Sequence, residues 1–230
     1  MAEDLTGRLG FKFDRGVLAY HDDPAGFVRD CFVWGDGKGP AQYQLDTLSA
    51  LAVHRRVAVR GGRSLGKSTT HAWAILWFAL TRDAAHEDWK CIVTSGAWGQ
   101  LVGFLWPEVK TKWAPRINWE RVGRSPFKDE SELMQRELRL RFGAVSMGAA
   151  STAARMEGAH ADELLYVLDE AKIVPDENWD SIEGAFAGAG PDAEQNAYAL
   201  ASSGSFASRL NRQAHSWPSS LASASSSVPV

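Results

Sequence analysis

The sequence predicts an α/β protein of three layers, in which helices cover both faces of a mainly parallel central sheet. Short apolar runs alternate with segments of helical periodicity, which is the pattern of strand–helix–strand units. The 230 residues are 45% hydrophobic and 23% charged, values ordinary for a globular protein with a sizeable core. They exclude a disordered chain, a collagen-like chain and a disulfide framework.

The first predicted elements lie between residues 41 and 95. Leucines recur at helical spacing within 41–54, so a helix is expected there. The short segment 56–60 predicts a strand, and the apolar segment 71–82 predicts a long buried helix. A second strand is expected over 90–95, where an apolar run ends in small residues.

The next elements are a helix and a hairpin. We expect a helix over 99–113 that is bent or broken near Pro107, because proline removes a backbone donor. Apolar and polar residues alternate over 137–150 around Gly143, which predicts a hairpin.

The last elements complete the sheet. The run 163–171 is continuously apolar until two acids end it, as in a buried parallel strand. A helix is expected from Asn178, and another buried strand over 196–204.

Composition divides the chain into three parts. We expect an N-terminal segment over 1–40 and one globular domain over 41–204. Residues 205–230 are rich in serine and have little to pack, which predicts a disordered tail.

Targeting signals are absent from the sequence. The N-terminus has no apolar stretch, and the longest apolar run, 72–80, is about half the length that crosses a bilayer. Cys31 and Cys91 are far apart and match no metal-ligand spacing, so we expect two reduced thiols. A soluble protein of the cytoplasm, without a membrane partner, is predicted.

Charge is small in sum but uneven. The formal net charge of −3 argues against a histone-like nucleic-acid binder. Residues 156–195 hold 11 acids against the single base Lys172. A basic group interleaved with Trp113 and Trp119 is either a DNA-facing patch or a solvated helix face. Its members are Lys110, Lys112, Arg116, Arg121 and Arg124.

The strongest motif is a phosphate-binding loop between the predicted strand 56–60 and the helix that follows. It matches GxxxxGK[ST] in full and consists of Gly61, Gly62, Arg63, Ser64, Leu65, Gly66, Lys67 and Ser68, with Thr69 next to it. Glycines let successive N–H groups face one anion, and the helix N-terminus adds partial positive charge. Lys67 is expected to reach the β- and γ-phosphates of ATP, and Ser68 to hold Mg²⁺.

The second half of such a site lies at the end of the strand 163–171. Asp169 is expected to hold the hydrated Mg²⁺, and Glu170 to orient or deprotonate the attacking water. An apolar run that ends in two acids is weak evidence for such a site by itself. It becomes strong evidence when it follows a phosphate loop by about 100 residues.

The order of these parts resembles the ATPase domain of the large subunit of phage terminases, the DNA-packaging motors of tailed phages. The resemblance covers about 35–204 and implies a P-loop NTPase fold of the RecA-like (ASCE) class. The loop and the acidic strand are shared by many P-loop ATPases. More particular are the stretch 40–44, Arg63 inside the loop, and the segment 155–160 that enters the acidic strand.

The resemblance implies further site residues. Tyr43 packs on adenine and Gln44 pairs with its edge, although Gln44 also fits a helix-surface glutamine. Arg63 acts on the γ-phosphate as an arginine finger, with Arg60 and Arg155 as weaker candidates. Ser202, Ser203 and Gly204 stand where the family has its coupling motif. The alternative is that these residues simply end a strand. The segment 94–98 is similar to a loop that faces DNA or a neighbouring subunit.

The partners implied by the resemblance are double-stranded DNA, a terminase small subunit and a portal protein. It also implies a homo-oligomeric ring of a phage or prophage protein in the cytoplasm of the bacterial host. Large subunits add a nuclease that uses several carboxylates around two metals. No Asp or Glu follows Glu194, so we expect no nuclease here, and a chain cut short by truncation or a frame shift near residue 205.

Two alternatives remain open. One is a helicase-like RecA-type ATPase, which needs a second such domain. The other is a catalytically silent nucleotide-binding relic in a prophage. The presence of all four predicted site residues, Lys67, Ser68, Asp169 and Glu170, argues against this alternative. Turnover with and without double-stranded DNA separates these possibilities.

Overall fold

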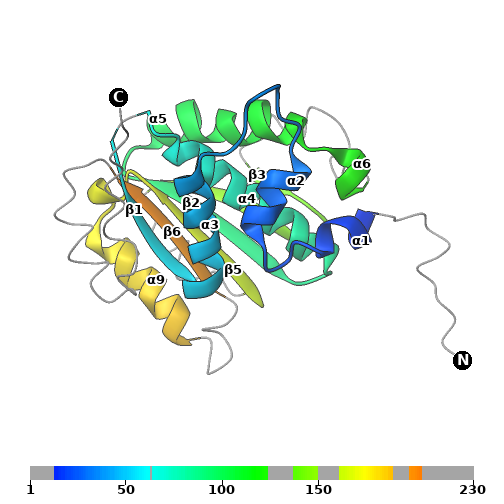
Figure 1. The fold of residues 1–230 in the computed structure, drawn as a ribbon. Helices are drawn as coiled ribbons and strands as arrows, with labels where there is room; N and C mark the ends of the chain where they lie inside the picture. Colours follow the sequence, from blue (N-terminus) through cyan, green and yellow to red (C-terminus); the bar gives the residue numbers. More distant parts are fainter. Residues whose placement is uncertain (1–12, 63, 124–136, 150–160, 189–196, 204–230) are drawn as a thin grey trace, which may run out of the picture.

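The computed structural model describes residues 13–62, 64–123, 137–149, 161–188 and 197–203 (Figure 1). Several residues predicted above lie outside these ranges, namely Arg63, Arg124, 155–160, Gly204 and the tail 205–230.

One six-stranded sheet forms the centre of the described chain. Its strands are β1 (Arg56–Arg60), β2 (Trp89–Ser95), β3 (Glu137–Arg139), β4 (Gly143–Ala149), β5 (Glu163–Asp169) and β6 (Ala197–Ser203). Their spatial order is β1-β6-β5-β2-β4-β3. Every neighbouring pair is parallel except β3–β4, which is the predicted hairpin.

The helices are unequal in length. The longer ones are α2 (Pro24–Cys31), α3 (Gln42–His54), α4 (Lys67–Ala84) and α9 (Asp176–Gly188). Shorter ones are α1 (Phe13–Leu18), α5 (Trp98–Gln100), η4 (Ala114–Arg116), α6 (Trp119–Val122) and η5 (Ala171–Ile173). Two π-helical segments, η2 (Leu101–Leu105) and η3 (Glu108–Trp113), continue α5.

The strands have a hydrophobic core on each face. Successive side chains of a strand point to opposite faces. Leu165 and Val167 of β5 therefore pack in a core with α4, whereas Tyr166 and Leu168 pack in a second core with Trp179 of α9. Figure 1 shows α9 apart from α3 and α4, with the strands between them. The predicted three-layer α/β architecture with a mainly parallel sheet is confirmed.

Helix α4 is the central helix of the larger core. All its residues from Thr70 to Ala84 are buried, which explains why apolar residues occur on every side of it. Trp73 packs edge-on against Trp34 and Trp113, with ring centroids 5.6 and 4.9 Å apart. The contact between Trp73 and Trp113 packs η3 against α4.

Two helices within 1–40 were not predicted as elements. Helices α1 and α2 pack on α4 and contribute Val17, Phe27 and Val28 to the larger core. The side chain of Asp23 caps α2 by accepting a 2.7 Å hydrogen bond from the N–H of Gly26.

The helix predicted over 99–113 does not break at Pro107. Trp106 and Pro107 remain helical, with a π-helical segment on each side. The widened turns accommodate a residue that has no N–H to donate. The helix predicted from Asn178 begins two residues earlier, at Asp176.

A buried arginine ties the amino-terminal residues to the sheet, at the end of α4 away from the phosphate loop. The Arg82 side chain is fully buried and its Nε lies 3.3 Å from Oε2 of Glu163. Its other nitrogens donate to the carbonyl of His21 at 2.6 Å and to the hydroxyl of Tyr198 at 2.9 Å. Burial lowers the pKa of Arg82 and raises that of Glu163, although each partner offsets part of the other's shift.

Two further expectations concern cysteines and membranes. Cys31 and Cys91 are buried free thiols, and burial raises the pKa of Cys31 to about 12. Among the helices of the described ranges, none has the length and apolar character needed to cross a bilayer.

Candidate functional site

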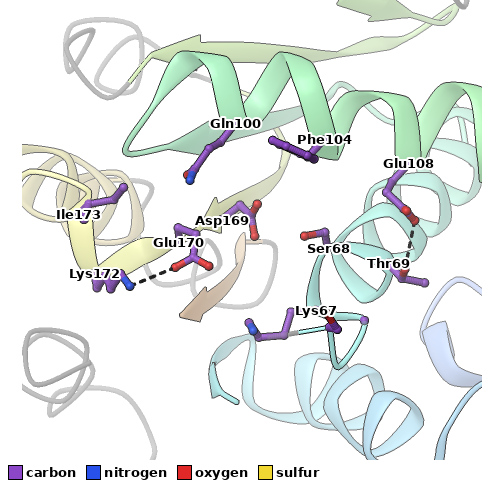
Figure 2. Close-up of a pocket in the computed structure, with 12 residues that line it drawn as sticks. Lys67, Ser68, Thr69, Gln100, Phe104, Glu108, Asp169, Glu170, Lys172 and Ile173 are labelled. Atoms are coloured by element: carbon purple, nitrogen blue, oxygen red, sulfur yellow. Dashed lines mark hydrogen bonds and ion pairs between the residues drawn. The ribbon is translucent and has the colours of Figure 1, made fainter. Parts of the chain in front are cut away.

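The candidate site lies where the parallel strands end. Because β1, β6, β5 and β2 run in the same direction, their carboxyl ends meet at one edge of the sheet. A pocket of about 820 Å³ opens there (Figure 2). It is lined by Ser64, Gly66, Lys67, Ser68, Thr69, Gln100, Phe104, Glu108, Asp169, Glu170, Lys172 and Ile173. The structure thus brings together both halves of the predicted phosphate and metal site.

The phosphate loop connects β1 to α4. Ser64 and Gly66 adopt left-handed conformations, with φ of 61° and 77°, and α4 begins immediately after Gly66. Glycine takes this conformation without steric cost. The N–H of Gly61 donates to the carbonyl of Ser203 at 3.2 Å, so the loop is tethered to β6 at its start.

Lys67 curls back over the loop. Its Nζ donates to the carbonyls of Gly61 at 3.1 Å and Gly62 at 2.7 Å. These contacts fold the side chain back onto the loop, and both Lys67 and Ser68 line the pocket. A point charge in this position suits a polyphosphate bound to the loop.

Gln44 braces the loop from α3. It is buried, and its Oε1 accepts from the N–H of Ala41 at 3.0 Å. Its Nε2 donates to the carbonyl of Gly66 and to Oγ1 of Thr70, both at 3.2 Å. Both amide groups are used inside the protein, so pairing with adenine requires Gln44 to give up these contacts. Neither Gln44 nor the neighbouring Tyr43 lines the pocket.

Asp169 ends β5 and is largely buried. Its Oδ1 lies 3.4 Å from Nδ1 of His71 and accepts from Oγ of Ser202, also at 3.4 Å. Burial raises the pKa of this carboxyl, but His71, Lys67 and Ser202 together bring the pKa below its ordinary value. Asp169 is therefore ionised at neutral pH, as a metal ligand must be.

Glu170 follows in a left-handed conformation, with φ of 48° and ψ of 47°. For a residue with a Cβ this conformation costs on the order of 1 kcal/mol. It turns the side chain toward the pocket, where Oε2 lies 3.7 Å from Nζ of Lys172 (Figure 2). A strained backbone at a carboxylate beside a phosphate loop is typical of a functional residue.

A close contact supports the turn after Glu170. Gly96 follows β2, and a Cβ at this position would overlap with the side chain of Ile173. The absence of that Cβ lets η5 pack on the end of β2. Gly96 thus helps to place the turn that carries Glu170.

Polar side chains flank Asp169 on both neighbouring strands. Ser95 of β2 is its register partner, and Ser202 and Ser203 end β6 on the other side. The hydroxyls of Ser95 and Ser203 are buried and make no hydrogen bond to the residues that the structure describes. The predicted coupling residues therefore lie between the phosphate loop and the acidic strand, with Gly204 outside the described ranges.

Glu108 is a pocket residue that the sequence did not reveal. Its Oε2 accepts from Oγ1 of Thr69 and from Nε1 of Trp113, both at 3.0 Å, and its Oε1 lies 2.7 Å from Nζ of Lys112 (Figure 2). Glu108 thus joins the first turn of α4 to η3. It lies 39 residues from Thr69, so no local pattern predicts the contact.

Three described members of the basic group make contacts within the fold. Lys110 is buried over the ring of Trp106, and burial lowers its pKa to about 8. Lys112 pairs with Glu108, and Arg121 lies 3.3 Å from Asp30. These side chains therefore pack on, or pair with, other residues of the described fold.

Solved structures similar to this chain include large terminases of phages. No model of a known protein family matches the sequence. No curated protein matches it either. The crystal structure of the HK97 bacteriophage large terminase is similar with a TM-score of 0.53 and 14% identity, over 80% of this chain and 37% of that chain. The ATPase domain of the Thermus phage P74-26 large terminase gives a TM-score of 0.45 at 18% identity, over 73% of this chain and 65% of that one.

The likeness to the HK97 protein concerns the fold, given the low identity, and this chain spans little more than a third of that protein. In the sheet of this chain, β6 lies between the strand before the phosphate loop and the acidic strand. The predicted P-loop NTPase fold and the predicted resemblance are confirmed. The chain has the P-loop α/β fold that is found in the HK97 bacteriophage large terminase.

Proposed function

We propose that this chain is a Mg²⁺-dependent ATPase and the motor domain of a large terminase. The observation that carries the proposal is the meeting of Lys67 and Ser68 with Asp169 and Glu170 around one pocket. These are the groups that phosphoryl transfer to water needs: a phosphate cradle, ligands for a metal, and a base.

The donor set fits Mg²⁺. Ser68 offers a hydroxyl and Asp169 an ionised carboxylate, and oxygen donors of this kind are the ones Mg²⁺ prefers. When bound, the metal neutralises charge that develops on the phosphate oxygens. Ser68 and Asp169 would supply protein oxygens to the metal.

The protein residues supply orientation, charge and a proton acceptor. Lys67 leaves the loop carbonyls and pairs with the β- and γ-phosphates, while the backbone N–H groups of the loop bind the polyphosphate. Glu170 accepts the proton of the attacking water. Ser202 and Ser203, beside Asp169, detect the loss of the γ-phosphate.

The work performed by this hydrolysis is translocation of double-stranded DNA into a viral capsid. We propose that the chain acts in a homo-oligomeric ring, with a terminase small subunit and a portal protein as partners. Support comes from the likeness in fold to the HK97 bacteriophage large terminase, which is a fold-level analogy. Tyr43, Gln44 and Arg63 complete the nucleotide site in this proposal.

ATP hydrolysis by purified protein tests the proposal. Lys67→Ala is expected to lower Mg²⁺-dependent phosphate release about 100-fold or more, because it removes the charge that stabilises the transferred phosphoryl group. Lys38→Ala is the matched control, since Lys38 is exposed in the loop before α3. Equal rates in the Lys67→Ala and wild-type proteins would contradict an ATPase at this site.

Double-stranded DNA in the same assay separates the alternatives. Stimulation of turnover by double-stranded DNA supports a packaging motor, whereas stimulation only by single strands supports a helicase-like ATPase. Nucleotide binding without turnover under every condition indicates a silent relic.

The contact between Gly96 and Ile173 gives a further prediction. Gly96→Ala is expected to reduce ATP turnover about tenfold, since a shift of about 1 Å in the turn that carries Glu170 is enough to misplace a reacting group. Adding Ile173→Ala removes the clash and is expected to restore turnover. Gly99→Ala is the control, because a Cβ there has no atom within 4 Å. A loss of turnover that Ile173→Ala does not restore would refute this cause.

A further inference from the structure

We propose that His71 is the positioning residue for Asp169: its Nδ1 lies against one carboxylate oxygen, so that the other oxygen faces the pocket as the metal ligand. The inference rests on the proposed function and deepens it, because it assigns a role to a residue outside the phosphate loop and the acidic strand end. His71 does not line the pocket.

The position of His71 on α4 places it behind the metal site. It follows Lys67 by four residues and Ser68 by three, so it lies on the same side of the helix one turn further on. Its side chain is 1% exposed and reaches the end of β5. The helix that begins with the phosphate loop thus contacts the acidic strand end through a polar group.

The contact is made to one oxygen of Asp169. Nδ1 of His71 and Oγ of Ser202 both lie 3.4 Å from Oδ1. Among the described residues, no hydrogen bond or ion pair reaches Oδ2. Asp169 lines the pocket, so this second oxygen is the one left to a ligand there.

Packing alone does not account for a histidine here. Neither ring nitrogen makes a hydrogen bond of good geometry to the described residues, although buried polar atoms are nearly always satisfied. The other buried polar side chains of α4 include Thr70, Thr81 and Arg82, and each of these is hydrogen-bonded. The polar contact of the His71 ring is the one with Asp169.

Groups that orient a metal ligand affect the metal more than the fold. Their removal typically lowers metal affinity about 10- to 100-fold. The test compares two polar variants of similar chemistry. His71→Asn places an amide nitrogen where Nδ1 lies, whereas His71→Gln carries its amide one bond further and leaves the Nδ1 position without a donor.

The measurement is the affinity for Mn²⁺ at saturating concentration of an ATP analogue with a β,γ-imido bridge, followed by the EPR signal of free Mn²⁺. His71→Gln is expected to weaken Mn²⁺ binding about tenfold. His71→Asn is expected to remain within about threefold of the wild type. Binding of the analogue in EDTA is expected to stay the same in both variants, because Asp169 acts on the metal.

Ile75→Val is the control for stability, since Ile75 is buried one turn after His71 and lies away from the pocket. It is expected to leave Mn²⁺ affinity unchanged. Equal Mn²⁺ affinity in wild type and His71→Gln, or equal weakening in both His71 variants, would overturn the inference alone. A wild-type chain that binds no analogue and no Mn²⁺ would overturn the proposed function and this inference with it.

Discussion

Glu170→Gln is expected to lower ATP turnover about 100- to 10,000-fold while nucleotide binding survives. Glutamine has nearly the shape of glutamate but accepts no proton from water at neutral pH. Glu170 reaches the pocket from a left-handed backbone position that glutamine tolerates no worse. The change therefore removes the base and leaves the phosphate loop and Asp169 in place.

Two measurements separate binding from chemistry. Phosphate release reports turnover, and fluorescence titration with a labelled ATP reports binding. The same substitution at Glu183 is the control, because that carboxylate lies on α9 and pairs with Arg56, away from the pocket. Unchanged turnover in Glu170→Gln would remove Glu170 from its role, and lost binding would assign it to nucleotide binding instead.

Arg82→Met is expected to lower the free energy of unfolding by about 3–5 kcal/mol. The guanidinium is fully buried, and its removal leaves the carboxylate of Glu163 and the carbonyl of His21 without their donor. Methionine retains much of the apolar contact with the ring of Trp77, over which the guanidinium lies at 4.7 Å. The expected loss of stability is therefore assigned to the carboxylate of Glu163 and the carbonyl of His21, which stay buried without their donor.

A double-mutant cycle isolates the pair. Arg82→Met combined with Glu163→Leu is expected to cost at least about 1 kcal/mol less than the sum of the single changes. Arg139→Met is the matched control, because Arg139 pairs with Glu137 on the surface and its side chain is 73% exposed. That change is expected to stay within about 0.5 kcal/mol in urea unfolding. Additive single changes would show that the buried pair is not coupled.

The elements that the sequence revealed are those with a strong local signal. Strand β5 is one continuous apolar run, and the phosphate loop is a complete motif between a strand and a helix. Both were predicted within a few residues. The order of the strands in the sheet follows from neither signal, because strand pairing depends on contacts between residues far apart in the chain.

The missed elements and residues have different causes. Helix α2 carries recognisable signals, Asp23 as its cap and Pro24 in its first turn, but it is only eight residues long. His71 immediately precedes the apolar run 72–80, and nothing in the sequence indicates that its spatial neighbour is Asp169. Glu108 meets Thr69 only because aromatic packing brings η3 onto α4.

The strand order also affects how the molecule folds. Strand β1 pairs only with β6 among the described strands, and β6 is the last of them to be synthesised. The loop that grips the phosphates and the strand that ends in Asp169 are therefore joined in one sheet only after residue 203 has been made. Pairing over such a sequence distance is slow compared with local contacts. On the ribosome, β1 and β5 are expected to become part of one sheet only after β6 has emerged.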